Sequence, residues 1–140
     1  MLEFYEKVEA IKRLYAKMSA PVEAKYGLTH LEFRILMFLA NHPGRDTATE
    51  IVEKEQVCKS YVSVSVRALQ ERGFLRGSSE KNDRRTVHLT LCETAAPIVS
   101  EGHEAQREFA NILLKDFTEA DKEAFRHCMK LLDRNLKAAI

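Results

Sequence analysis

The sequence predicts a mainly α-helical domain with one small β-hairpin. Apolar residues recur at intervals of three and four near both ends, helix-capping signals open the segments between them, and one stretch alternates with a period of two. At 140 residues and 45% hydrophobic, the chain can form one compact domain, or one lobe with helical extensions that need a partner. The predicted single domain (1–140) has helical ends at 1–27 and 93–140 and a head at 28–92.

Both ends carry the apolar spacing of helices that pack along one stripe. Pro21 cannot donate a backbone hydrogen bond, which predicts a bend or an early end to the first helix. Pro97 fits the first turn of a helix that begins near Thr94, and Thr118 with Asp121 predicts a capped start for the last helix. The stripes exceed what one small core can cover, so we expect dimerisation, with an intramolecular bundle as the alternative. The expected interface residues are Phe4, Val8, Ile11, Tyr15, Phe109, Phe125, Met129, Leu132 and Leu136.

The centre of the chain predicts a compact head of short helices. Thr29–Glu32 and Thr47–Glu50 are capping boxes that open two of them. The next segment is ambiguous, because Tyr61–Val66 alternates like a strand while its valines and Leu69 share a helical face. We predict a helix that Gly73 closes. Two short helices, the second presenting polar and basic groups from its first turns, have the form of a helix-turn-helix DNA reader.

A β-hairpin with a polar, basic tip follows this helix. Phe74–Ser78 and Thr86–Leu91 are predicted strands, and Ser79–Arg85 between them is too polar to pack. Most charge runs are simply solvated. Arg84 and Arg85 at an exposed tip, however, would suit a phosphate backbone or a DNA minor groove.

Positive charge is concentrated in the middle of the chain. The total is only +1, but residues 59–90 hold seven Lys and Arg side chains against three Asp and Glu, a net charge of +4. The two ends are slightly acidic. This asymmetry favours DNA over a protein as the partner of the central region.

Several other classes of protein find little support in the sequence. Cys58, Cys92 and Cys128 are odd in number and widely spaced, so we expect no disulfide framework, and a reducing cytoplasm fits best. No apolar run is long enough to span a bilayer. There is no Gly-rich phosphate loop, nucleophile motif or cluster of metal ligands, so we expect no enzyme, no cofactor and no metal site.

Four segments carry a resemblance to a known family: Val57–Ser63, Leu69–Arg76, Asn82–Arg85 and His88–Leu91. The Asp-x-Arg pattern in the third segment, a dozen residues after a Leu-x-x-x-Gly helix end, is the most specific of these. Together they resemble the MarR family of bacterial transcriptional regulators, whose fold is a winged helix-turn-helix head with long dimerisation helices. The resemblance covers nearly the whole chain.

The resemblance implies a homodimeric transcriptional regulator that binds a pseudo-palindromic double-stranded DNA operator. The expected action is repression, and a small-molecule effector is expected to release the protein from the operator. It implies major-groove contacts from Lys59, Ser60, Tyr61 and Ser63. Arg84 or Arg85 would enter the minor groove, and Asp83 would pair with a wing arginine and orient it. Arg67 and Arg76 are expected backbone contacts, with solvated charges as the alternative.

Two alternative functions stay open. The winged fold can serve as a protein-interaction module without DNA binding. Cys58, at a helix N-terminus beside Lys59, could be the thiolate of a redox-responsive regulator, although a half-buried structural cysteine is the more common case. No motif identifies an effector site; His30, Arg34 and Arg13 are candidates for lining a crevice between the head and the dimer helices.

Overall fold

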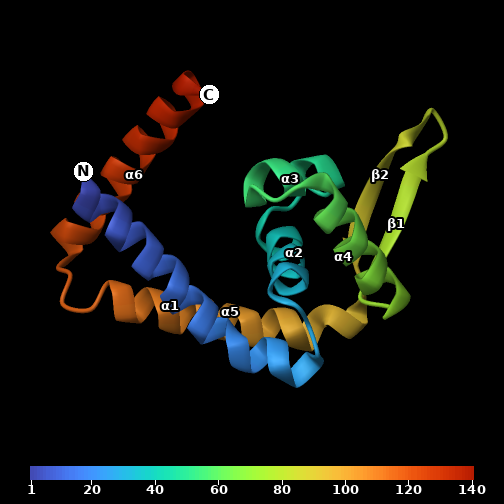
Figure 1. Cartoon of the computed structure of the whole chain (residues 1–140), viewed down its shortest axis with the longest axis horizontal. Helices are drawn as coiled ribbons and strands as arrows, with labels where there is room; N and C mark the ends of the chain where they lie inside the picture. The colour runs from blue at the N-terminus through green and yellow to red at the C-terminus, as the bar shows by residue number, and fades with distance from the viewer.

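The computed structural model describes all 140 residues, and its helices and hairpin confirm the predicted fold class. The elements are α1 (Leu2–Tyr26), α2 (His30–Asn41), α3 (Ala48–Glu55), α4 (Lys59–Glu71), β1 (Leu75–Glu80), β2 (Asp83–Leu91), the 3-10 turn η1 (Glu93–Ala95), α5 (Ala96–Leu113) and α6 (Glu119–Ala139). In Figure 1, α2, α3, α4 and the hairpin form a head that stands on α1 and α5. α6 leaves the far end of α5, and the hairpin projects from the opposite side of the molecule.

α2 lies at the centre of the head (Figure 1) and buries most of its apolar side chains there. The Thr29 hydroxyl accepts from the Glu32 amide at 3.1 Å, and the Glu32 carboxylate accepts from the Thr29 amide at 2.8 Å, so the predicted capping box is confirmed. The 13 buried apolar residues of the core are Leu28, Phe33, Ile35, Leu36, Met37, Phe38, Ile51, Val62, Leu69, Leu75, Leu89, Ala95 and Ile98.

Gly102 allows α5 to approach α2 closely. A Cβ at this position would lie 2.5 Å from Met37 Sδ and 3.1 Å from a ring carbon of Phe33, so any side chain would displace the core. Ile98, one turn earlier on α5, is fully buried. The first half of α5 is therefore part of the head's core, and α1 packs along it.

α1 continues through Pro21 to Tyr26, so the predicted early end at Pro21 is wrong. Proline removes one backbone hydrogen bond. The buried Ser19 hydroxyl donates to the Glu23 carboxylate at 3.0 Å, one turn across the proline. The helix ends instead at Gly27, whose left-handed backbone (φ 61°) forms a glycine cap.

The segment that alternates like a strand is helix α4, as predicted from its apolar face. Val62 and Leu69 are fully buried on that face. Gly73 (φ 77°) closes the helix, and the amide of Phe74 donates to the carbonyl of Leu69 at 2.9 Å. The helical pattern prevails because it buries one face of the segment in the core.

The two other predicted caps differ from each other. Thr118 forms a complete capping box with Asp121 at the start of α6, as predicted. At the start of α3 the Thr47 hydroxyl accepts from the Glu50 amide at 3.3 Å, but the Glu50 carboxylate accepts from that hydroxyl and pairs with Arg45 instead of reaching back to the Thr47 amide. The second predicted capping box is therefore only half formed.

The predicted interface residues fall into two groups. Tyr15 and Phe109 are half-buried and contact each other edge to face within one chain, with ring centroids 5.3 Å apart. No residue of α6 is buried. The large apolar side chains left exposed on the two ends include Phe4, Ile11, Phe125, Met129, Leu132 and Leu136. The intramolecular packing considered as the alternative thus holds for the middle of α1 and α5 but leaves α6 unpartnered.

None of the helices combines the length and the apolar character needed to cross a membrane.

Candidate nucleic-acid interface

The N-terminal half of α4 presents the side chains predicted for the major groove. Lys59, Ser60, Tyr61 and Ser63 are all exposed. Tyr61 is 66% exposed and Val64 is 69% exposed, so the core uses neither of these large side chains. Arg67 is exposed farther along the helix. Because Val62 and Leu69 hold the opposite face in the core, the helix can offer this face without loosening the head.

The residue at the start of α4 does not cap the helix with its side chain. Cys58 occupies the N-cap position with an extended backbone, and its side chain makes no capping hydrogen bond. Free amides at a helix start form a ready binding position for a phosphate oxygen. Cys58 is exposed, contrary to the half-buried structural cysteine expected. The Ser60 hydroxyl, 3.2 Å from the sulfur, and the amide of Tyr61 lower the pKa of this thiol.

The hairpin has longer strands and a shorter tip than predicted. Glu80 pairs with Asp83 at the end of the antiparallel ladder, so the connecting turn is only Lys81–Asn82. Arg84 and Arg85 therefore lie on β2 and not in a loop. The strands extend into polar sequence because ladder pairing satisfies backbone groups whether or not the side chains are buried.

The register of the hairpin shifts opposite the two arginines. Pairing is regular from Leu75 to Ser78, but residues 84–87 of β2 lie opposite a single residue of β1, so alternation does not assign Arg84 and Arg85 to opposite faces. Val87 lies against α4, since it lines a groove of about 270 Å³ together with Arg67 and Ser63. The structure therefore brings Val87 of the hairpin, Arg67 and the α4 surface together.

Arg76 is exposed and lies on β1 opposite Thr90. The next residue, Gly77, lies against α4, because an added Cβ there would come within 3.1 Å of the Gln70 side chain. Alternation therefore puts Arg76 on the hairpin face that points away from α4. It is separated from the surface that the other predicted residues share.

Asp83 does not pair with an arginine side chain, so that prediction is wrong. Its carboxylate accepts from the backbone amides of Arg85 at 3.1 Å and Thr86 at 3.3 Å, and from the Thr86 hydroxyl at 2.7 Å. These hydrogen bonds lower the pKa of the Asp83 carboxyl. A short acidic side chain often bonds the backbone two or three residues ahead, and here that local geometry prevails over ion pairing. Asp83 thus holds the backbone of Arg85 and Thr86 at the start of β2.

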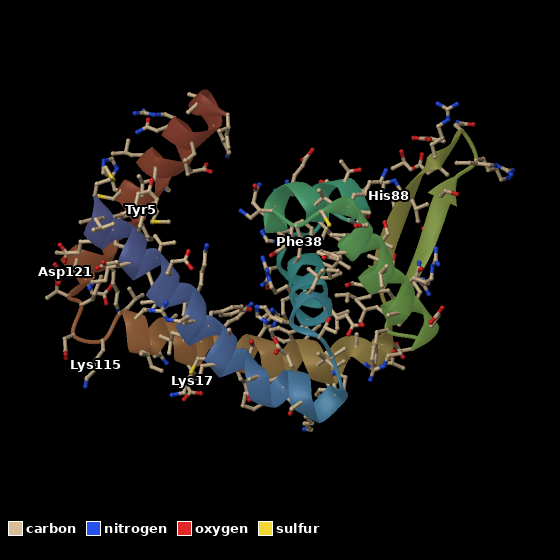
Figure 2. The ribbon with its side chains drawn as sticks, in the orientation of Figure 1. Tyr5, Lys17, Phe38, His88, Lys115 and Asp121 are labelled. Carbon is tan, nitrogen blue, oxygen red and sulfur yellow. The ribbon has the colours of Figure 1, made fainter.

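The base of the hairpin is joined to the head at Asp46, just before α3. The Leu89 amide donates to the Asp46 carbonyl at 2.8 Å, and His88 Nδ1 lies 2.7 Å from Asp46 Oδ1. Figure 2 shows His88 where β2 faces the head. The Asp46 carboxylate raises the pKa of His88. No sequence pattern predicts this contact, because it joins residues 42 positions apart and follows no motif.

Replacing Asp46 with Asn should lower the pKa of His88, which an NMR titration of the imidazole would measure. Because the folded-state pKa is raised, the stabilisation from this pair is complete below the unfolded-state pKa of about 6.5. It is lost as pH rises through the folded-state pKa. Glu80→Gln is the control, since Glu80 acts on His88 through space only and should have a smaller effect. An unchanged His88 pKa in Asp46→Asn would contradict the assignment.

A pocket of about 730 Å³ lies between the head and the helices α1 and α5. Its lining includes the predicted His30 and Arg34, but Lys12 and not the predicted Arg13 faces it. Arg34 is held at the pocket wall, where its Nε donates to the Glu55 carboxylate at 2.8 Å and its terminal nitrogen donates to the Glu55 carbonyl at 3.2 Å. The pocket therefore adjoins the turn that leads into α4.

Three comparisons with known proteins agree with this geometry. Residues 26–86 match the family model described as MarR family. The chain is 33% identical over 86 residues to the transcriptional regulator ZitR of Lactococcus lactis subsp. cremoris, covering 61% of this chain and 57% of ZitR. It is 26% identical over 91 residues to the HTH-type transcriptional regulator YwhA of Bacillus subtilis, covering 65% of each. The match thus spans less than two thirds of the length of either relative.

The fold is shared over almost the whole chain. The structure of Staphylococcus aureus MarR in complex with salicylate and kanamycin superposes with a TM-score of 0.78 and 19% identity, covering 99% of this chain and 93% of that chain. The family match lies on the head, and the structural match extends to both helical ends. The chain thus resembles the MarR family of winged helix-turn-helix transcriptional regulators: residues 26–86 match the family model, and the fold is shared over almost the whole chain.

Proposed function

We propose that the protein is a homodimeric repressor that binds a pseudo-palindromic DNA operator and is released by a small-molecule effector. One observation carries this proposal: the exposed face of α4 and the arginine-bearing strand β2 form one surface within a region of net charge +4. Such a surface suits a major groove and the phosphates beside it. In this proposal residues 28–92 bind DNA, while 1–27 and 93–140 form the dimer.

The unpartnered ends support the dimer. Phe125, Met129 and Leu132 follow one another along α6 at helical spacing and are each more than 40% exposed in the single chain. Ile11 on α1 is similarly exposed. A second copy would cover these side chains, and two-fold symmetry would present two α4 helices to successive major grooves.

The pocket beside Arg34 supports effector control. Lys12, Arg34 and Lys54 line it against one carboxylate, that of Glu55, so its charge favours an anionic ligand. Such a ligand would compete with Glu55 for Arg34 and so disturb the turn before α4. Salicylate in the complex of Staphylococcus aureus MarR has this chemistry. A thermal-shift screen of aromatic carboxylates, followed by operator release, tests the effector step.

Fluorescence anisotropy against the DNA that flanks the gene tests the main proposal. We expect nanomolar binding that weakens steeply with salt, because each phosphate contact contributes about −0.9 to the slope of log K against log salt concentration. Absent or salt-insensitive binding would favour the protein-interaction module instead. An unrelated DNA duplex of the same length is the control for sequence preference.

A further inference from the structure

Arg72, the residue that ends α4, reaches across to the C-terminal end of α1. One terminal nitrogen of its guanidinium donates to the Gly27 carbonyl at 2.9 Å, and the other donates to the Tyr26 carbonyl. These carbonyls lie where helix α1 ends and backbone oxygens lack partners within the helix. The planar guanidinium fork matches two neighbouring acceptors, which a lysine ammonium cannot do in the same way. No other hydrogen bond joins α4 or its cap to α1.

The surroundings of Arg72 fix its side chain in this position. Its guanidinium carbon lies 4.9 Å from the centroid of the Phe74 ring, in a cation–π contact. The guanidinium also lies against Gly27, where an added Cβ would be at an ordinary contact distance of 3.9 Å from its nearer nitrogen. The positive charge also stands at the negative end of the α1 dipole, where it is favourable.

The same turn of α1 is fastened to α5. Lys25 Nζ lies 2.6 Å from a carboxylate oxygen of Glu101, and the Tyr26 hydroxyl donates to the other oxygen of that carboxylate. α1 is a single helix of 25 residues whose other end carries exposed apolar side chains. One continuous helix therefore connects the proposed dimer surface with the carbonyl groups that bind Arg72 (Figure 1).

We propose that Arg72 is a positioning residue for operator binding, which fixes the direction of α4 relative to the dimer helices. This inference rests on the proposed DNA-binding function. The two α4 helices of a dimer must meet half-sites about 34 Å apart. A freely tilting α4 would lose more conformational entropy on binding, and it would also bind better to half-sites with the wrong spacing. Arg72 acts through α4 and makes no contact with DNA itself.

The test compares Arg72→Gln and Arg72→Lys with the wild-type protein on the operator and on operators lengthened by one or two base pairs at the centre. We expect Arg72→Gln to bind the operator roughly fivefold or more weakly, which is the lower end of typical coupling between sites. The difference in affinity between the natural operator and the lengthened operators should become smaller. The slope of log K against log salt concentration should not change. Arg72→Lys should resemble Arg72→Gln, because it keeps the charge but lacks the fork.

Three results would overturn the proposal. A salt slope reduced by about 0.9 would make Arg72 a direct phosphate contact. Unchanged affinity and spacing preference would remove any positioning role, and a Lys variant that behaves as wild type would show that charge alone suffices. Arg107→Gln is the matched control, since Arg107 lies on α5, is exposed, and approaches only Glu104 at 3.9 Å. It should leave every readout unchanged.

A measurement without DNA separates this inference from the proposed function. Spin labels at Asn82, in a variant with Cys58, Cys92 and Cys128 replaced by Ser, report the distance between the two hairpin tips of a dimer. Arg72→Gln should broaden this distance distribution. If the wild-type protein bound no operator but the distribution still broadened, the DNA-binding proposal would fail while the positioning role would stand. An unchanged distribution would refute the positioning role.

Discussion

Replacing Arg84 and Arg85 together with Ala should weaken operator binding by roughly 1 to 3 kcal/mol for each arginine that binds DNA well. Both side chains are exposed, and neither forms an ion pair within the chain, so their charge is available to DNA. The fold should be unaffected, because the core residues of the hairpin are Leu75 and Leu89. Fluorescence anisotropy measures the affinity, and circular dichroism checks the fold.

The single variants refine this expectation. Each single variant should weaken binding less than the double variant does, because each keeps one of the two exposed arginines. The larger effect is expected for Arg85→Ala, because the Asp83 carboxylate holds the backbone amide of Arg85 in place. Lys81→Ala in the turn is the control for removal of a nearby positive charge. Unchanged affinity in the double variant would remove the hairpin from the DNA-binding surface.

Local sequence signals predict most of the fold. The capping boxes at Thr29 and Thr118 and the glycine after α4 each act within four residues of the chain, and the structure contains all three. The helix predicted over Tyr61–Val66 is also confirmed, because burial of one apolar face decides between helix and strand. The wrong early end at Pro21 shows the limit of a local rule, since packing against α5 continues that helix.

The contacts that position the site could not be predicted in this way. His88 meets Asp46 and Arg72 meets Gly27 only after the chain has folded, over separations of 42 and 45 residues. The partner predicted for Asp83 is wrong because a sequence does not show whether a carboxylate will form an ion pair with a side chain or accept hydrogen bonds from the neighbouring backbone. The apolar pattern of the dimer stripe likewise could not separate Tyr15, which is half-buried against Phe109 of its own chain, from Ile11, which stays 41% exposed.

Replacing Ile11 and Met129 together with Asp should separate the dimer into monomers, as measured by sedimentation velocity. These side chains are 41% and 49% exposed in the single chain, so the change should not disturb the core of the head. In a dimer interface, however, each carboxylate would be buried without a partner, which is strongly unfavourable. Circular dichroism should remain close to that of the wild-type protein. Ile140→Asp is the control, since Ile140 is 98% exposed at the end of the chain.

Separation of the dimer should reduce operator affinity far more than removal of one hairpin arginine does. Two linked heads bind a pair of half-sites with an avidity that can exceed that of one head by about 10² to 10⁴. The Ile11 and Met129 variant keeps every predicted DNA-contacting residue, so its affinity for an isolated half-site should match that of wild-type heads. An intact dimer in sedimentation would show that the interface lies elsewhere. If monomers still bound the full operator at wild-type affinity, dimerisation would not be the source of the protein's operator affinity.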